Sequence, residues 1–152
     1  MNEKNKAAIH RWFEEVWNQG REAAIYEMFP RNGVAHGLGD SEVDVHGPDE
    51  FKPLVDNIRG LMPDLHVSIE DIFEEGDRAA VRLTLEGTHT GRGLGIEPTG
   101  RRVRIQGIII ARMIDGQIVE AWNSYDQLGL LRQIGALPSL AGRNTFLSAN
   151  RA

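Results

Sequence analysis

Acidic, aromatic and hydroxyl side chains recur at every second position of residues 117–126, where a predicted strand gives way to a helical pattern. Side chains two residues apart share one face of a strand. One face therefore carries Glu120, Trp122, Ser124 and Asp126. A carboxylate desolvated against a large apolar ring has a raised pKa, which suits a general base. This segment is the strongest candidate in the chain for acid/base chemistry.

The elements that precede this segment begin with helices. An apolar stripe at helical spacing, ended by Gly20, contains Ile9, Trp12, Phe13, Val16 and Trp17. A second helix is expected over residues 22–28, because Pro30 disfavours a helical conformation in the residue before it. After a short strand at 34–37, a third helix is expected to start at residues 47–50. Pro53 predicts that this helix begins late or bends.

From residue 65 onward the hydrophobic period becomes that of strands. We expect strands over 65–73, 78–90, 102–114 and 117–125, with a short final helix that ends at Gly135. Asp115-Gly116 lies between two apolar runs and predicts a tight hairpin turn. The predicted fold class is α+β, a curved antiparallel sheet covered by the N-terminal helices. Such a sheet leaves a cone-shaped cavity that suits a small ligand.

Length and composition limit the possible classes of protein. The 152 residues suffice for one domain, expected over 1–137, with 138–152 as a mobile or partner-docking tail. The net charge is -5 and basic residues cluster only at 101–104, which argues against a nucleic-acid partner. Without cysteine there is no disulfide, thiolate metal site or cysteine nucleophile. A charged start and no run of about 20 apolar residues predict a cytoplasmic protein without a membrane span.

Two further segments imitate binding motifs. Residues 36–46 hold two histidines and three acids, but their spacing fits no helix-borne ligand pair, so we expect a solvated loop and no metal site. The glycines of residues 91–95 follow a strand but do not lead into a helix start, so the amide cradle of a phosphate loop is missing. They predict a flexible loop at the rim of the cavity.

Several motifs together resemble a known family. They are residues 115–122 with Asp126 and 128–135, residues 15–20 at the end of the first helix, His36-Gly37, residues 87–91 and residues 98–101. In this pattern the chain resembles the SnoaL-like polyketide cyclase and ester cyclase group of the nuclear-transport-factor-2-like superfamily, which has a ketosteroid-isomerase-like fold. The resemblance runs from the first helix to Gly135.

The resemblance implies a cofactor-free enzyme that closes a ring by an intramolecular aldol reaction on a polyketide ester. It implies that Asp126 removes a proton next to a carbonyl and later returns one, while His36 and His89 donate hydrogen bonds to the enolate. The expected substrate is a small apolar or aromatic molecule with a carbonyl group. Its apolar walls would be Trp122, Trp17, Phe51 and Met62. The family resemblance also implies a homodimer formed through the sheet.

Each candidate catalytic residue has a structural alternative. Asp126 stands where a strand becomes a helix, so it is equally placed to cap that helix, a role worth about 1 kcal/mol. His36 is also expected as a buried histidine that a backbone carbonyl satisfies. His89 leads into the glycine-rich loop, and a hydrogen bond that fastens this loop is its alternative role.

The remaining alternatives concern the core, one strand face and the function itself. Trp12 and Trp17 are expected in the core, with at most one of them reaching the cavity. Arg82 binds an oxyanion or carboxylate if the polar face of its strand points inward, and otherwise meets solvent or a second subunit. The run 108–110 has no polar alternation, which predicts that both faces of the sheet are covered there. Alternative functions are a non-catalytic module for an apolar or aromatic metabolite and an isomerase or hydrolase on the same fold.

Overall fold

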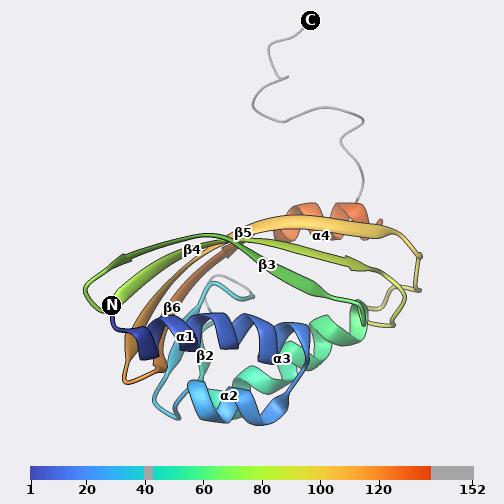
Figure 1. Ribbon diagram of the computed structural model, residues 1–152. Helices are drawn as coiled ribbons and strands as arrows, with labels where there is room; N and C mark the ends of the chain where they lie inside the picture. The colour runs from blue at the N-terminus through green and yellow to red at the C-terminus, as the bar shows by residue number, and fades with distance from the viewer. Residues whose placement is uncertain (40–42, 138–152) are drawn as a thin grey trace, which may run out of the picture.

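Helices from the N-terminal part of the chain pack beneath one face of a curved sheet (Figure 1). The computed structural model describes residues 1–39 and 43–137, so the predicted tail 138–152 lies outside the described residues. None of the described helices is long and apolar enough to span a bilayer. The elements in chain order are α1 (Glu3–Arg11), η1 (Trp12–Asn18), α2 (Glu22–Met28), β1 (Val34–His36), β2 (Val45–His46), α3 (Gly47–Leu61), β3 (His66–Glu75), β4 (Arg78–Thr88), β5 (Arg102–Ile114), β6 (Gln117–Tyr125) and α4 (Gln127–Gln133).

The first helix changes its winding halfway along. Asn2 caps α1 by accepting a hydrogen bond from the Asn5 backbone, and from Trp12 the helix continues as the π-helical segment η1. At its end the Gln19 N–H donates to the Glu14 carbonyl, five residues back, at 2.9 Å. The predicted apolar stripe is confirmed, because all five of its side chains are buried. The wider turn is a feature that the period alone did not predict.

α3 begins where the acidic start signal stands, and Pro53 lies inside it. Of the two alternatives predicted for Pro53, the late start was therefore wrong, and a bend stays a prediction. Gly47 adopts a positive φ of 70°, and its N–H donates to the Gly33 carbonyl at 2.9 Å, so the turn into the helix is fixed ahead of the proline. At the other end Arg59 donates to the Trp17 and Asn18 carbonyls, which ties α3 to the end of η1.

The strands form one six-stranded sheet in the order β2-β1-β6-β5-β4-β3. All neighbouring pairs are antiparallel except β1 and β6, which run parallel. The predicted bounds of β5 and β6 match the structure, whereas β4 ends two residues earlier than predicted, at Thr88. β2 is a correction, because residues 36–46 were expected to form only a loop. Asp115 and Gly116 both have positive φ, as the predicted hairpin turn requires.

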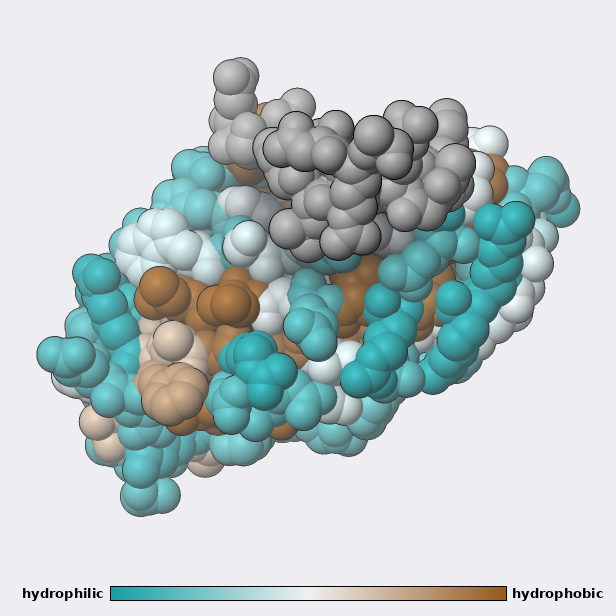
Figure 2. Space-filling model, turned by 90° about the horizontal axis from the view of Figure 1, so that it is seen from above, coloured by the Kyte–Doolittle hydropathy of each residue, from teal (hydrophilic) through white to brown (hydrophobic). Residues whose placement is uncertain are grey.

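The two faces of the sheet differ sharply in burial. On the inner face, which the helices cover, Ala79, Val81, Leu83 and Leu85 of β4 are all buried, so the polar set that includes Arg82 points outward. In β5 the middle residue of the isoleucine run, Ile109, faces inward, while Ile108 and Ile110 face outward and are 54% and 41% exposed. Figure 2 shows the outer face from above, with apolar side chains grouped between charged ones.

Candidate functional site

Two small adjoining cavities lie between the helices and the inner face of the sheet. Cavity 1 has a volume of about 30 Å³ and lies mainly between η1, α3 and strands β5 and β6, while cavity 2, of about 60 Å³, extends toward α4. Both cavities are bordered by Phe13, Trp17, Leu38 and Tyr125. Pockets that bind drug-sized ligands usually measure roughly 300–1,000 Å³. A multi-ring ligand therefore fits only if some of these shared side chains move apart.

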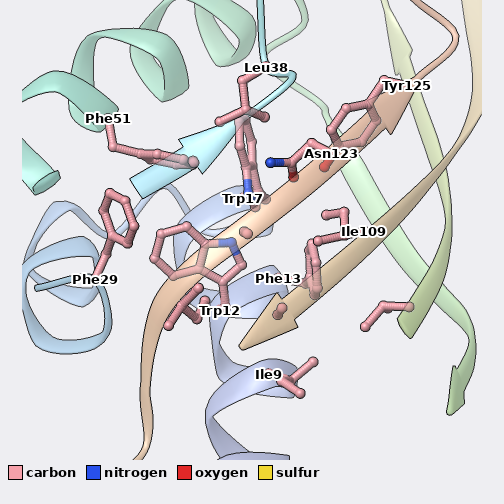
Figure 3. A pocket seen from close by; sticks show the side chains of 15 residues that line it. Ile9, Trp12, Phe13, Trp17, Phe29, Leu38, Phe51, Ile109, Asn123 and Tyr125 are labelled. Carbon is pink, nitrogen blue, oxygen red and sulfur yellow. The ribbon is translucent and has the colours of Figure 1, made fainter. Parts of the chain in front are cut away.

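Aromatic rings make up much of the wall of cavity 1 (Figure 3). Phe51 of α3 is central, since its ring centroid lies 5.0 Å from that of Trp12, 5.9 Å from that of Trp17 and 5.4 Å from that of Phe29, with edge-to-face geometry. Both tryptophans of the first helix line this cavity, so the expectation that at most one would reach it was wrong. Met62, fully buried, lines cavity 2. A role of Trp17, Phe51 and Met62 in substrate binding stays a prediction.

The polar side chains that line the two cavities come from the end of β6 and the start of α4. They are Asn123, Tyr125 and Gln127, at alternate positions on the inward side of the chain. The Asn123 amide donates to the His36 carbonyl at 2.8 Å, and the Gln127 amide donates to the Leu38 carbonyl at 3.3 Å. Burial raises the pKa of the Tyr125 phenol, which therefore stays protonated at neutral pH. Tyr125 is the one ionisable residue among the described residues that line these cavities.

Sequence reasoning missed these three residues because it weighted the other face of the same segment. The alternation that groups residues 120, 122, 124 and 126 on one face also groups residues 121, 123, 125 and 127 on the other, and this second set could have identified them. Ala121 is buried on the inner face, and Asn123 and Tyr125 follow it at spacings of two. A buried neighbour at i−2 marks which of the two alternating sets faces the core.

Asp126 occupies the outward position at the end of the sheet. Its side chain is exposed, and its Oδ1 accepts a hydrogen bond from the Gly129 backbone at 2.9 Å, as the N-cap of α4. The capping alternative is thus confirmed. Asp126 borders the outer face of the sheet together with Ile108 and Ser124, whereas its chain neighbours Tyr125 and Gln127 line cavity 2. Its role as a base stays a prediction.

His36 lies on the outer face, held between two carboxylates. Its Nδ1 is 2.9 Å from Asp44 Oδ1 and its Nε2 is 2.9 Å from Glu120 Oε2. The hydrogen bond to Glu120, followed by that to Asp44, raises the pKa of His36. The expectation that a backbone carbonyl would satisfy His36 was wrong, because parallel pairing of β1 with β6 brings it beside Glu120 instead.

Trp122 stacks on His36 at the outer face. The ring centroids are 5.6 Å apart, and the Arg78 guanidinium lies 5.3 Å from the centroid of the indole on the same face. Trp122 does not line either interior cavity, so its predicted place in an apolar wall there was wrong. The reason is strand alternation, since Ala121 and Asn123 on either side of Trp122 take the inward positions.

His89 is fully buried and fastens the glycine-rich loop. Its Nδ1 lies 2.9 Å from Thr99 Oγ1, and its backbone exchanges hydrogen bonds with the backbone of Arg101 and Gly100. The loop-fastening role is therefore confirmed. The Thr99 backbone also donates to Nδ1, so Nε2 carries the ring proton, and this atom has no partner among the described residues. The structure does not bring His89, His36 and Asp126 together.

The structure also locates the glycine-rich loop and Arg82, for which the sequence predicted a flexible rim and two alternative orientations. At Gly91 the chain passes so close to the Gly60 carbonyl that a Cβ would collide with it, so this glycine is required for close packing, and the flexibility of the loop stays a prediction. Arg82 points outward and pairs with Asp71 at 2.6 Å, which confirms the alternative of an outward arginine. Among residues 1–39 and 43–137, no three histidine or acidic side chains are arranged to hold a metal ion.

The fold and the interior cavities together define a class of protein. Helices cover one face of a curved, mostly antiparallel sheet around an apolar interior with a few polar groups at one end, which is the architecture of a small-molecule pocket protein.

Comparison with known proteins then gives the family. The family model described as SnoaL-like polyketide cyclase matches residues 7–134, so the chain belongs to this family. An aklanonic acid methyl ester cyclase of Streptomyces peucetius is 27% identical over 80% of this chain and 84% of its own length. A nogalonic acid methyl ester cyclase of Streptomyces nogalater is 34% identical over 59% of this chain and 67% of its own length. A SnoaL-like protein of known structure from Jannaschia sp. CCS1 has a TM-score of 0.78 and 25% identity, and the match covers 89% of this chain and 94% of the other. The predicted fold and family are confirmed.

Proposed function

We propose that this protein is a polyketide ester cyclase that acts on an apolar, carbonyl-containing molecule held between the helices and the sheet. The observation that carries this proposal is the interior itself, where aromatic walls surround two cavities and polar groups gather at the β6–α4 junction. Two relatives are named as cyclases of polyketide methyl esters, of aklanonic acid and of nogalonic acid. Polyketide esters of this kind are the substrate class proposed here.

The proposed reaction is an intramolecular aldol closure that loses and gains no atoms. A base removes a proton from carbon next to one carbonyl, the enolate carbon bonds to a second carbonyl carbon, and the new alkoxide takes a proton back. Asp126 is the proposed base, because it follows Trp122 at the position that the family resemblance assigns to the catalytic aspartate, and its chain neighbours Tyr125 and Gln127 line cavity 2. To act, it would exchange its hydrogen bond with the Gly129 backbone for one with the substrate.

Asp126→Asn tests this proposal with aklanonic and nogalonic acid methyl esters as probes. Asparagine caps a helix nearly as well as aspartate, so the variant should keep its melting temperature. Turnover, followed as conversion of the open ester to its cyclic isomer by chromatography, should fall by about 10²- to 10⁴-fold. Turnover equal to that of the unaltered protein would remove Asp126 as the base.

A second candidate function is a non-catalytic module that binds an apolar metabolite. It is favoured by one observation: no carboxylate or histidine is among the described residues that line the two cavities. Binding of either ester without conversion by the unaltered protein, under conditions in which a methyl ester cyclase of the family turns over, would support this candidate. Conversion that survives repeated purification would exclude it.

A homodimer formed through the outer face of the sheet belongs to the same proposal. Phe73, Ile108 and Ile110 are 70%, 54% and 41% exposed there, and apolar side chains gathered on one face often mark an interaction site. Ile110→Lys should shift the species seen by analytical ultracentrifugation from dimer to monomer. Ile114→Lys near the edge of the β5–β6 hairpin is the matched control, with a smaller expected shift.

A further inference from the structure

The Tyr125 ring is held in a fixed place by a glycine on the neighbouring strand. Gly107 pairs with Tyr125 across β5 and β6, and a Cβ at position 107 would lie 2.5 Å from Cδ1 of the tyrosine. The ring therefore lies across the backbone of β5, where any other residue would displace it. From this position the side chain borders both interior cavities.

Tyr125 and Asn123 present different hydrogen-bonding groups to cavity 1. The Tyr125 hydroxyl has no protein partner within the described part of the chain, and burial keeps it protonated, so it is a free donor. The Asn123 amide nitrogen donates to the His36 carbonyl at 2.8 Å, so the amide oxygen is the acceptor that this cavity-lining side chain can offer to a ligand. In Figure 3 the two side chains extend from the same strand toward the same space.

The surroundings of Tyr125 and Asn123 limit the ligands that can bind beside them. The other side chains of cavity 1 are aliphatic or aromatic residues of the core, and their polar atoms are limited to the indole N–H groups of Trp12 and Trp17. In such surroundings a polar ligand atom that meets no partner costs about 1–3 kcal/mol. A ligand that offers one acceptor oxygen beside one O–H satisfies both protein groups, whereas a simple ester leaves the Asn123 oxygen unpaired.

We infer that Tyr125 and Asn123 form a donor–acceptor pair that binds the enol form of a 1,3-dicarbonyl unit. Tyr125 donates to the carbonyl oxygen, and the enol O–H donates to Asn123. When the enol O–H proton passes to the base, the negative charge of the resulting enolate is shared by both oxygens, and the one beside Tyr125 meets a hydroxyl donor already in place. This inference rests on the proposed function, because it assigns residues to the same interior site.

Two esters that differ in one carbonyl test the inference. The probes are ethyl benzoylacetate, a 1,3-dicarbonyl compound, and ethyl 3-phenylpropanoate, which lacks the keto oxygen, each titrated into the full chain by calorimetry. The unaltered protein should bind the keto ester more tightly by on the order of tenfold. Tyr125→Phe keeps the ring over Gly107 and should lose this preference while still binding ethyl 3-phenylpropanoate.

A matched tyrosine elsewhere supplies the control. Tyr26 is 45% exposed and donates to Asp49 at 2.7 Å on the surface, so Tyr26→Phe should leave the preference unchanged. Gly107→Ala is the second variant, since it displaces the ring but keeps the hydroxyl, and it should lower the preference as well. Circular dichroism on each variant separates a change in binding from a loss of fold.

Two results would overturn the inference: no preference for the keto ester in the unaltered protein, including no binding at all, or an undiminished preference in Tyr125→Phe. Because calorimetry needs no turnover, this outcome is independent of the Asp126 experiment. If Asp126→Asn turns over normally while Tyr125→Phe loses the preference, the base assignment fails and the donor–acceptor pair stands. The opposite pattern leaves the cyclase proposal intact and removes the pair.

Discussion

The two faces of β6 carry different kinds of chemistry although they alternate along the same nine residues. The outer face holds Glu120 and Trp122 in a charged cluster with His36, while the inner face presents Asn123 and Tyr125 to an apolar interior. The charged and aromatic residues of the outer face are easily noticed in the sequence because of their residue types. The more conspicuous set of polar residues in a strand is therefore not always the set that faces the interior cavities.

The largest expected difference is between the inner and outer faces of the sheet, in the loss of unfolding free energy when an aromatic residue is replaced by alanine. Phe51→Ala empties the centre of the aromatic cluster, where the ring is 3% exposed, and should lower the free energy of unfolding by about 3–5 kcal/mol. Phe73→Ala, at an outer-face site that is 70% exposed, should change it by no more than about 0.5 kcal/mol. Urea denaturation of the two variants at a concentration that keeps the chain monomeric gives both values. Equal losses would mean that the outer face is a second core.

Two glycines, Gly107 and Gly60, are expected to respond oppositely to replacement by alanine. Gly107→Ala forces the Tyr125 ring away and should cost about 1–3 kcal/mol of unfolding free energy. Gly60 lies in α3 with open space around it, so Gly60→Ala should instead stabilise the protein by about 0.4–1 kcal/mol. Thermal melting of both variants checks the two signs. A stabilised Gly107→Ala would show that Tyr125 is not held by this contact.

Replacing Asp126, the N-cap of α4, should lower the unfolding free energy by a smaller amount. Asp126→Ala removes the cap of α4 and should lower the unfolding free energy by about 1 kcal/mol, whereas Asp126→Asn should lower it by a few tenths at most. Urea midpoints of the two variants provide the measurement. If both variants lose the same amount, the negative charge and not the cap geometry stabilises the helix.

The smallest expected effect is a pH dependence confined to the outer face. The raised pKa of His36 means that its pairing with Glu120 and Asp44 stabilises the fold fully below the unfolded value of 6.5, and that this stabilisation is lost as pH rises through the higher folded value. His36→Gln should flatten the decline in urea midpoint that begins as pH rises above 6.5. His10→Gln, on the exposed side of α1, is the matched control and should leave the decline in place. On the inner face the raised pKa of Tyr125 lies far above this range and adds no slope.

The sequence predicted most of the fold because its signals are local. The apolar stripe of the first helix, the start at residues 47–50 and the Asp115-Gly116 turn each depend on neighbouring residues, and the structure contains all three. Parallel pairing of β1 with β6 depends on residues about 85 positions apart, as in the register of Val34 with Glu120, and no local period reveals it.

The site was harder to predict for the same reason. His36 and Trp122 were placed at the interior because their residue types suit chemistry, but the side on which they lie is set by how β6 packs on the helices. Trp17, Phe51 and Met62 were placed correctly on cavity walls because their stripes are buried whatever the pairing. Apolar lining follows from hydrophobic periodicity, whereas the choice between two polar faces requires the tertiary contacts.

The π-helical segment η1 sets the positions of the aromatic side chains that line cavity 1. Trp12, Phe13 and Trp17 stand on it, and its bonds span five residues where those of an α-helix span four. Each wider turn therefore carries more residues than an α-helical turn and changes the direction in which successive side chains project. The three aromatic rings owe their positions on the cavity wall to this winding.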